Sequence, residues 1–254
     1  MEKLLQGIGK NFQLAADAEV TIEANPGTLT PEKLALYRRY GINRISIGLQ
    51  SPENQELRAL GRIHNYQQFL ESYHMAREAG FSNINIDLMF AIPGQSYEGW
   101  IQNLRTVAKL GPEHISAYSL IIEEGTPFSA RKLDLPDEDT EYRMYEDVAA
   151  VLGKYGYYQY EISNYAKKDR NCRHNEGYWQ RKDYLGLGLG AASLVGRERF
   201  TNTSDMSEYL ENSGNLEKIR TDRETLTRED EMGEFMFLGL RMTKGVSKKD
   251  FQEY

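Results

Sequence analysis

Three acidic or amide side chains stand where short apolar runs of the sequence end, which is where α/β proteins place groups that bind ligands. Glu23 and Asp87 each lie shortly before a Pro-Gly turn, and Gln50 ends the run 44–50. A buried carboxylate without a partner is costly or takes up a proton, so each acid needs a hydrogen-bond donor or a cation. The residue types therefore predict a ligand site. The alternative is that Asp87 only caps a neighbouring loop.

A regular alternation of strands and helices is expected to position these side chains. The run 84–92 is too apolar for a strand with one wet face, so it predicts a strand of a parallel sheet covered by helices. The unbroken strand and helix rhythm implies right-handed crossovers, and ligands of such folds bind beyond the carboxyl ends of the strands. We expect strands at 18–23, 44–51, 84–92 and 114–122, and helices at 31–40, 53–60, 66–79 and 97–109.

The second half of the chain is less regular. We expect a helix at 139–155 and a strand at 157–163 that would close the remaining segment of a barrel. Tyrosines crowd this strand, and packing of one face explains them better than a platform for a tetrapyrrole. The run 186–190 lacks the full dinucleotide fingerprint, so its glycines indicate close backbone packing. Beyond residue 200 the pattern predicts a small helical region.

Composition indicates a cytoplasmic protein. The chain has 254 residues, 40% of them hydrophobic and 27% charged, with a formal net charge of −7, which suits one large domain or a large and a small one. No apolar run approaches the length that spans a membrane, and no signal peptide opens the chain. A single cysteine, Cys172, fits a reducing compartment. Acids outnumber bases, so nucleic acid is not an expected partner.

Several motifs, in their order along the chain, resemble those of the radical S-adenosylmethionine superfamily. They are Ile22-Glu23-Ala24-Asn25-Pro26, Ile45-Ser46-Ile47-Gly48-Leu49-Gln50-Ser51, Gly61-Arg62, and Asn85-Ile86-Asp87-Leu88-Met89 with Ile92-Pro93-Gly94-Gln95. The branch they resemble is the oxygen-independent coproporphyrinogen III oxidase-like (HemN/HemW) group. The segment 172–179, followed by 184–188, resembles the His-Asn-x-x-Tyr-Trp signature of its heme chaperones. This resemblance implies an α/β fold: an incomplete parallel (β/α) barrel of the radical-SAM type that lacks its first strands, with a small C-terminal helical region.

The resemblance also implies a cofactor site. Glu23, Gln50, Arg62 and Asp87 correspond to family residues that hold S-adenosylmethionine, and Ile121 corresponds to a residue that lines the adenosyl pocket. The types fit, because a ligand with an ammonium, a carboxylate and two ribose hydroxyls needs acids and amides as acceptors and one arginine for the carboxylate. Taken singly, Arg62 also fits an ordinary surface residue and Ile121 a core residue. No catalytic residue and no metal ligand is assigned.

Two parts of the family pattern are missing from this chain. In the family a Cys-x3-Cys-x2-Cys loop holds a [4Fe-4S] cluster and a Gly-Gly-Gly-Thr-Pro segment follows it, whereas Cys172 is the single cysteine here. One thiolate cannot hold a cluster that takes three or four. Because 2–8 resembles the interior of a helix and 245–254 a helix that has just begun, we expect an internal fragment that is inactive as given. Ala91 replaces the usual family glycine, and its methyl group is expected to crowd the turn slightly.

His174 carries the functional hypothesis of the second half. A neutral imidazole can ligate heme iron, with Tyr178 and Trp179 covering the ring faces. The alternative is a histidine hydrogen-bonded to a turn beside a packing tryptophan, and a Cys-x-His pair is too sparse for a metal site by itself. We expect a partial barrel at 1–165 and a truncated C-terminal region at 166–254.

The resemblance implies two functions for the parent protein. One is the oxidative decarboxylation of coproporphyrinogen III to protoporphyrinogen IX through a 5′-deoxyadenosyl radical. The other, which the His-Asn signature favours, is to bind heme and deliver it to an acceptor protein without oxidase activity. S-adenosylmethionine, a [4Fe-4S] cluster in the complete protein, and heme are the expected cofactors, and porphyrin or heme and a heme-acceptor protein are the expected partners. A third hypothesis is an acid-base or metal-dependent barrel enzyme that uses Glu23 and Asp87.

Overall fold

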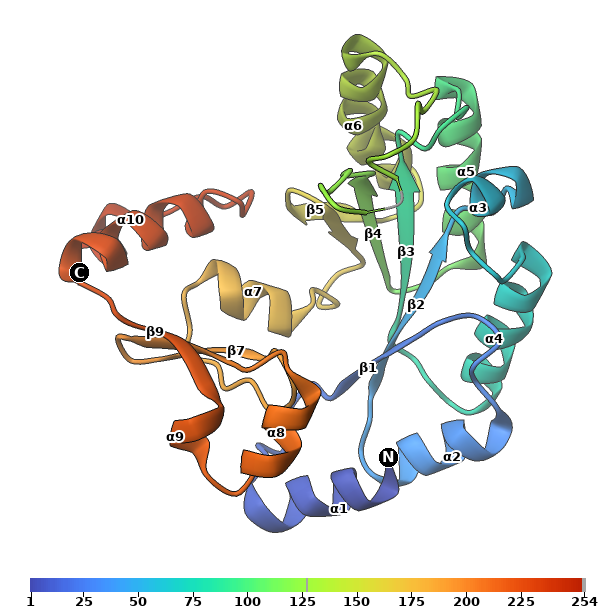
Figure 1. Cartoon of the computed structure of the whole chain (residues 1–254). Helices are drawn as coiled ribbons and strands as arrows, with labels where there is room; N and C mark the ends of the chain where they lie inside the picture. The colour runs from blue at the N-terminus through green and yellow to red at the C-terminus, as the bar shows by residue number, and fades with distance from the viewer. Residues whose placement is uncertain (127, 253–254) are drawn as a thin grey trace. The chain divides into compact units, whose positions relative to one another are not determined.

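A six-stranded sheet organises the first of two compact units in the structure, a computed structural model that describes residues 1–126 and 128–252 (Figure 1). The first unit is Met1–Asn171 and the second begins at Cys172. The strand order is β1-β2-β3-β4-β6-β5, and the first four strands are parallel, as the alternating pattern predicts. The strands are β1 Thr21–Ala24, β2 Arg44–Gln50, β3 Ile84–Phe90, β4 His114–Ser119, β5 Tyr158–Glu161 and β6 Asn164–Ala166.

The last two strands differ from the single barrel strand predicted at 157–163. β5 and β6 form an antiparallel hairpin, β6 pairs antiparallel with β4, and β5 lies at the edge of the sheet. Two residues join the strands, and so short a connection permits only antiparallel neighbours. The Glu161 side chain stabilises the turn by accepting a hydrogen bond from the backbone N–H of Ser163 at 3.0 Å.

Helices of the first unit begin where the sequence offers caps. Thr30 accepts a hydrogen bond from the Lys33 N–H, and Asn65 forms a capping box with Gln68, which satisfies N–H groups that a helix leaves unpaired. Gly111 ends a helix in the left-handed conformation with φ 74°. The helices are α1 Glu2–Asn11, α2 Pro31–Arg39, α3 Asn54–Ala59, α4 Tyr66–Glu78, α5 Tyr97–Leu110 and α6 Glu138–Gly153.

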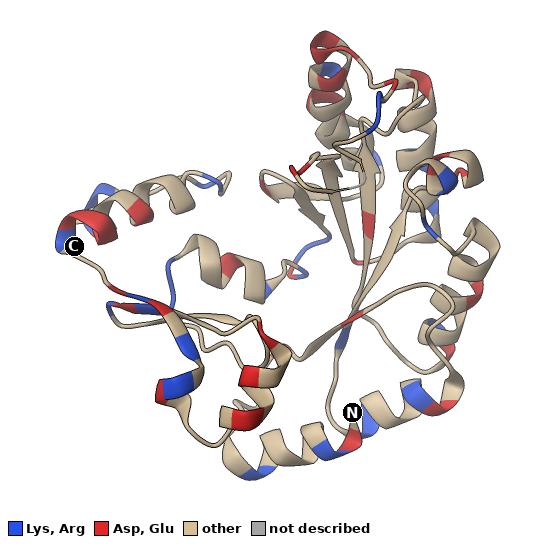
Figure 2. Cartoon of the chain, viewed as in Figure 1, with Lys and Arg blue, Asp and Glu red and all other residues tan. Residues whose placement is uncertain are grey.

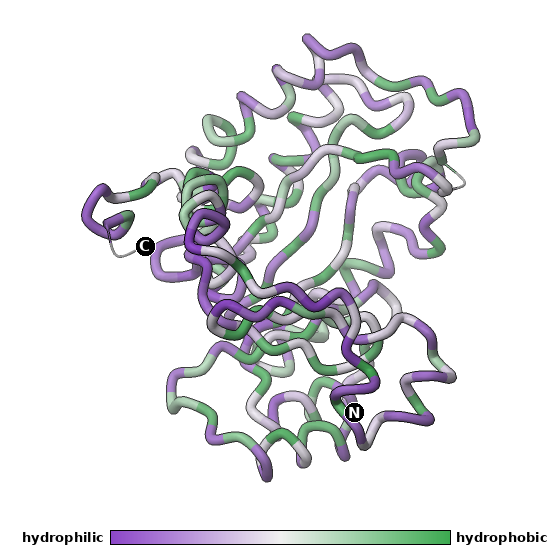
Figure 3. Tube along the Cα trace, turned by 60° about the vertical axis from the view of Figure 1, so that its left-hand side comes forward, coloured by the Kyte–Doolittle hydropathy of each residue, from purple (hydrophilic) through white to green (hydrophobic). Residues whose placement is uncertain are grey.

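The two faces of the sheet differ in chemistry because side chains alternate along each strand. One face is apolar, and helices α2, α4, α5 and α6 contribute to the same buried cluster as its residues, which include Ile45, Ile47, Leu49, Ile84, Ile86, Leu88 and Ile115. Figure 3 shows short hydrophobic and hydrophilic stretches alternating along the chain. The opposite face, called the polar face below, carries Glu23, Ser46, Gln50, Asn85, Asp87, His114, Ser116 and Tyr118.

Arg77 joins helix α4 to the sheet. Its guanidinium donates to Glu113 at 2.7 and 3.2 Å, to the Tyr73 hydroxyl at 2.8 and 3.0 Å, and to the backbone carbonyls of Phe81 and Gly111. Glu113 also accepts a hydrogen bond from the Ile84 N–H at 3.0 Å. A partly buried charge pair with this many partners holds the loops at the amino ends of β3 and β4, on the side opposite the predicted ligand site.

The second unit combines helices with a three-stranded antiparallel sheet, which the sequence pattern did not indicate. Glu234 of α10 pairs with Arg181 at 2.9 Å and with Arg199, and Glu231 pairs with Arg181 at 3.3 Å and Arg197 at 3.1 Å. Residues 253 and 254, part of the expected final helix, lie outside the described residues. The elements are α7 Arg173–Trp179, β7 Ala192–Val195, β8 Glu198–Asn202, α8 Met206–Asn212, α9 Leu216–Ile219, β9 Arg220–Thr225, α10 Arg228–Gly239 and α11 Lys248–Phe251.

Charges of both signs are interspersed over the helices, as along α1 and α2 in Figure 2. Acidic segments also interrupt β1 and β3, the strands that carry Glu23 and Asp87. Among the residues that the structure describes, no helix has the length and apolar character needed to cross a membrane.

Candidate functional site

Asp87 lies on the polar face of β3 and is held by neutral donors. Asn85 donates its amide Nδ2 to Asp87 Oδ1 at 2.7 Å, and the Ser46 hydroxyl donates to Asp87 Oδ2 at 3.2 Å. Burial raises the pKa of the Asp87 carboxyl, the hydrogen bonds oppose this shift, and the negative charge of Glu23 adds to it. Both donors are side chains on strands, so these hydrogen bonds run within the sheet and not to a neighbouring loop.

Gln50 ends β2 in an unusual conformation. Its φ is 71°, in the left-handed region that non-glycine residues seldom occupy, and its side chain is 4% exposed. The amide oxygen accepts a hydrogen bond from the Tyr118 hydroxyl at 3.0 Å. A Cβ added to Gly48 would lie 3.0 Å from Gln50 Nε2 and 3.8 Å from Asn25 Oδ1. The Gln50 side chain therefore folds back over Gly48, and strained residues of this kind cluster at binding sites.

The Tyr118 hydroxyl lies close enough to the other residues predicted for the site to feel their charges. Burial raises the pKa of Tyr118 to about 12, and Asp87 and Glu23 add to the shift, while the Gln50 hydrogen bond and the charge of Arg62 oppose it. Glu23 is exposed on β1 beside Ser46, and Arg62 is partly buried in the turn after α3. Four of the five residues expected to hold S-adenosylmethionine therefore lie on or beside the polar face, within electrostatic reach of one another.

Ile121 is placed differently from the other four. Strand β4 ends at Ser119, so Ile121 follows the strand by two residues instead of ending it, and its side chain is 77% exposed. It is therefore no core residue. An exposed isoleucine beyond the carboxyl end of β4 suits a residue that an apolar ring would cover.

The residue after β3 has a positive φ, as Gln50 at the end of β2 does. Ala91 has φ 55° and is 4% exposed. The usual family glycine at this position therefore has a conformational reason, the positive φ, more than the crowding expected from the sequence.

His174 belongs to the second unit. It lies on α7, exposed, with its ring edge-on to Tyr178 at 4.7 Å, and Tyr178 is in turn edge-on to Tyr184 at 4.7 Å. Trp179 instead packs against Arg241, whose guanidinium carbon lies 4.2 Å from the ring centre. Tyr178 thus lies beside His174, whereas Trp179 packs on Arg241, and the expectation that both cover the faces of a heme stays a prediction.

The site residues that the sequence did not predict lie on the same face of the sheet as those that it did predict. Ser46, Asn85, His114, Ser116 and Tyr118 complete the hydrogen bonding of the polar face. A period of two, counted from Gln50 and Asp87 along their own strands, would have identified the first two. The residues on β4 needed the register of the sheet.

The side chains of the described residues do not fit an iron–sulfur cluster. Cys172 is buried at the start of α7, and the described residues contain no group of three or more His, Cys, Asp or Glu that could hold a metal ion.

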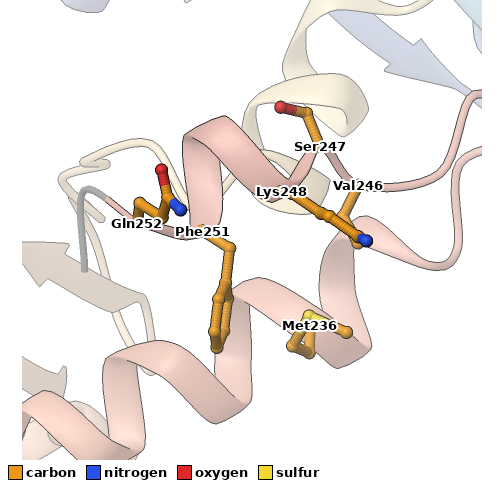
Figure 4. A pocket seen from close by; sticks show the side chains of 6 residues that line it. All are labelled: Met236, Val246, Ser247, Lys248, Phe251 and Gln252. Carbon is orange, nitrogen blue, oxygen red and sulfur yellow. The ribbon is translucent and has the colours of Figure 1, made fainter.

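A separate hollow lies between α10 and α11 in the second unit (Figure 4). Its volume is about 410 Å³, and Met236 and Phe251 line it with Lys248 at the side. None of the residues predicted for the site lines it.

Comparison with known proteins identifies the family. Residues 2–107 match the radical SAM superfamily and residues 226–254 match the HemN C-terminal domain. The heme chaperone HemW of Bacillus subtilis (strain 168) is 38% identical over 258 residues, covering 100% of this chain and 68% of that protein. HemW of Escherichia coli (strain K12) is 44% identical over 195 residues, covering 77% and 52%.

A solved structure shares the fold. Coproporphyrinogen III oxidase (HemN) from Escherichia coli, described as a radical SAM enzyme, superposes with a TM-score of 0.85 at 24% identity, covering 99% of this chain and 61% of that one. This chain therefore belongs to the radical S-adenosylmethionine superfamily, in the branch that contains HemW and HemN.

Proposed function

We propose that this chain carries the S-adenosylmethionine-holding face and the heme-binding helix of a heme chaperone. The observation that carries the proposal is the convergence of Gln50, Asp87, Arg62 and Glu23 around Tyr118 at the polar face. Acceptors of this kind suit hydroxyl and ammonium donors, and an arginine suits a carboxylate. S-adenosylmethionine would supply the sulfonium chemistry of the superfamily.

The residues of the chain have distinct roles in this proposal. Asp87, oriented by Asn85 and Ser46, accepts hydrogen bonds from the cofactor, and Gln50, fixed by Tyr118, presents its amide N–H groups. Arg62 pairs with the cofactor carboxylate. Asp87 accepts hydrogen bonds mainly from neutral side chains. Its ionised carboxylate therefore interacts little with cationic side chains that would compete with the cofactor.

Binding of S-adenosylmethionine to the 254-residue chain tests this half of the proposal. Isothermal titration calorimetry should show that Asp87→Asn and Gln50→Leu each weaken binding about tenfold or more, since each loses a hydrogen bond to a charged or buried group. Glu98→Gln, an exposed acid in the first turn of α5, is the matched control and should bind as the parent does. An absence of binding by the parent chain would refute the cofactor assignment.

We further propose heme as the cargo, with His174 as an iron ligand and a heme-acceptor protein as the partner. The HemW relatives support this assignment, and His174 is exposed with Tyr178 against its edge. Of the other histidines, His64 and His114 are 7% and 0% exposed, so they would have to leave their sites to reach a heme.

His74 provides a matched control for heme binding, because it too is an exposed histidine on a helix. In a heme titration followed by the Soret band, His174→Ala should lose the shift of the bound form, while His74→Ala should keep it. An unchanged Soret shift in His174→Ala would remove His174 as a ligand. Turnover of coproporphyrinogen III by the complete protein under reducing, anaerobic conditions would favour the oxidase alternative instead.

A further inference from the structure

A chain of hydrogen bonds runs across the polar face behind Asp87. His114, which is 0% exposed on β4, has its Nδ1 2.6 Å from Asn85 Oδ1 and its Nε2 2.8 Å from the Tyr160 hydroxyl. Asn85, 2% exposed, donates from Nδ2 to Asp87 at 2.7 Å and to Ser46 at 2.8 Å. Four strands, β2, β3, β4 and β5, thus supply one continuous network.

The chemistry of the groups fixes the direction of every bond. A carboxylate only accepts, so the amide N–H₂ of Asn85 must face Asp87 and its oxygen must face His114. That oxygen cannot donate, so His114 Nδ1 carries the proton. Burial, and then the charge of Arg44, holds the pKa of His114 well below its usual range, so the ring is neutral and Nε2 accepts from Tyr160.

We infer that His114, through Asn85, is a positioning residue for the ligand-binding carboxylate of Asp87. Its Nδ1–H holds the Asn85 amide in the one orientation that donates to Asp87. In the opposite orientation Asn85 Oδ1 would face the carboxylate, two acceptors would meet, and the carboxylate would turn away from the ligand. Ser116, 3.2 Å from Asn85 Oδ1, supports the same orientation. The inference rests on the proposed role of Asp87 in holding S-adenosylmethionine.

Two isosteric replacements of His114 separate positioning from packing. The side-chain nitrogen of asparagine stands about where Nδ1 stands, so His114→Asn keeps the donor to Asn85. The terminal amide of glutamine stands about where Nε2 stands and can turn its oxygen there, so His114→Gln still accepts from Tyr160 but loses the donor to Asn85. Both variants disturb the buried site and lose one contact of the ring.

Titration of the full chain with S-adenosylmethionine should distinguish the two variants. We expect His114→Asn to bind within about threefold of the parent and His114→Gln about tenfold more weakly, the value of one buried hydrogen bond that is lost. In an Asp87→Asn background, which no longer has an ionised acceptor to orient, the two His114 variants should bind alike. Equal affinities of His114→Asn and His114→Gln in the parent background would overturn the inference.

A spectroscopic test needs neither ligand nor variant. ¹⁵N NMR of the histidine ring in the folded chain should show His114 neutral and protonated at Nδ1, and an Nε2-protonated ring would overturn the inference. If the parent does not bind S-adenosylmethionine while the Nδ1–H form is observed, the proposed cofactor site fails and the positioning network stands. The two failures are therefore distinguishable.

Discussion

Replacing Gly48 by alanine should damage ligand binding without damaging the fold. The added Cβ would lie 3.0 Å from Gln50 Nε2, whereas ordinary contacts begin near 3.4 Å. The Gln50 amide must then shift by a few tenths of an ångström, and this stretches its 3.0 Å hydrogen bond to Tyr118. Gly48 has no positive φ, so alanine meets no backbone strain there.

The expected magnitude follows from that one contact. A net hydrogen bond contributes about 1 kcal/mol, so S-adenosylmethionine should bind about fivefold more weakly. Alanine is better than glycine within a strand by roughly 0.5–1 kcal/mol, which offsets the crowding. The free energy of unfolding should therefore stay within about 1 kcal/mol of the parent value.

A double-mutant cycle with Tyr118→Phe provides the assay. Tyr118→Phe removes the same contact, so combining it with Gly48→Ala should add almost no further loss in calorimetric affinity. Gly153→Ala in α6, where a Cβ meets nothing within 4 Å, is the matched control and should leave binding unchanged. Full binding by Gly48→Ala, or additive losses in the cycle, would refute the argument.

Three further predictions concern charges. Arg77→Met should lower the free energy of unfolding in urea by about 3–5 kcal/mol, because Glu113 is left partly buried without its cation. The pKa of Asp87 is raised on folding, so the stability it contributes is present below its ordinary value of 3.8 and is lost as pH rises through the raised value; Asp87→Asn should flatten this part of a stability-against-pH curve. Glu161 Oε2 and Asn164 Oδ1 are both buried without a hydrogen-bond partner, so Glu161→Gln, which adds a donor there, should preserve or raise the unfolding free energy.

Each of these predictions has a control. Arg105→Met, an exposed arginine on α5, should change stability by less than about 0.5 kcal/mol, and an equal loss in Arg77→Met would contradict the role of its partners. Affinity for S-adenosylmethionine should rise over the pH range in which the Asp87 contribution to stability falls, because binding needs the ionised carboxylate. Glu161→Ala should destabilise the chain, and a milder effect than that of Glu161→Gln would count against the hydrogen-bond argument.

Most of the first unit could be predicted from the sequence, because helix caps and apolar runs directly favour the helices and strands that form there. The caps at Thr30 and Asn65 begin α2 and α4 where expected, and the apolar run around Ile86 is indeed a central parallel strand. Pairing at the end of the sheet was not predictable in this way. The hairpin of β5 and β6 depends on a two-residue turn inside one continuous polar and aromatic stretch.

The site was predicted one residue at a time and the structure supplied the connections. Asp87 and Gln50 stand out by type and position, but the left-handed backbone of Gln50 leaves no mark on its own residue type. His114 resembles an ordinary strand residue until register places it opposite Asn85. Long-range register is set by the packing of the whole sheet, which a local pattern does not contain.

The two-sided sheet also determines which kinds of sequence change the chain can accept. Apolar anchors and ligand-facing groups interleave residue by residue, as Ile86 and Asp87 do in β3. A substitution touches one face only, so binding can change while the core persists. Deletion of a single residue within β3 would instead exchange the faces of all residues beyond it, placing carboxylate in the core and isoleucine before the ligand. In these strands, length is under stricter constraint than composition.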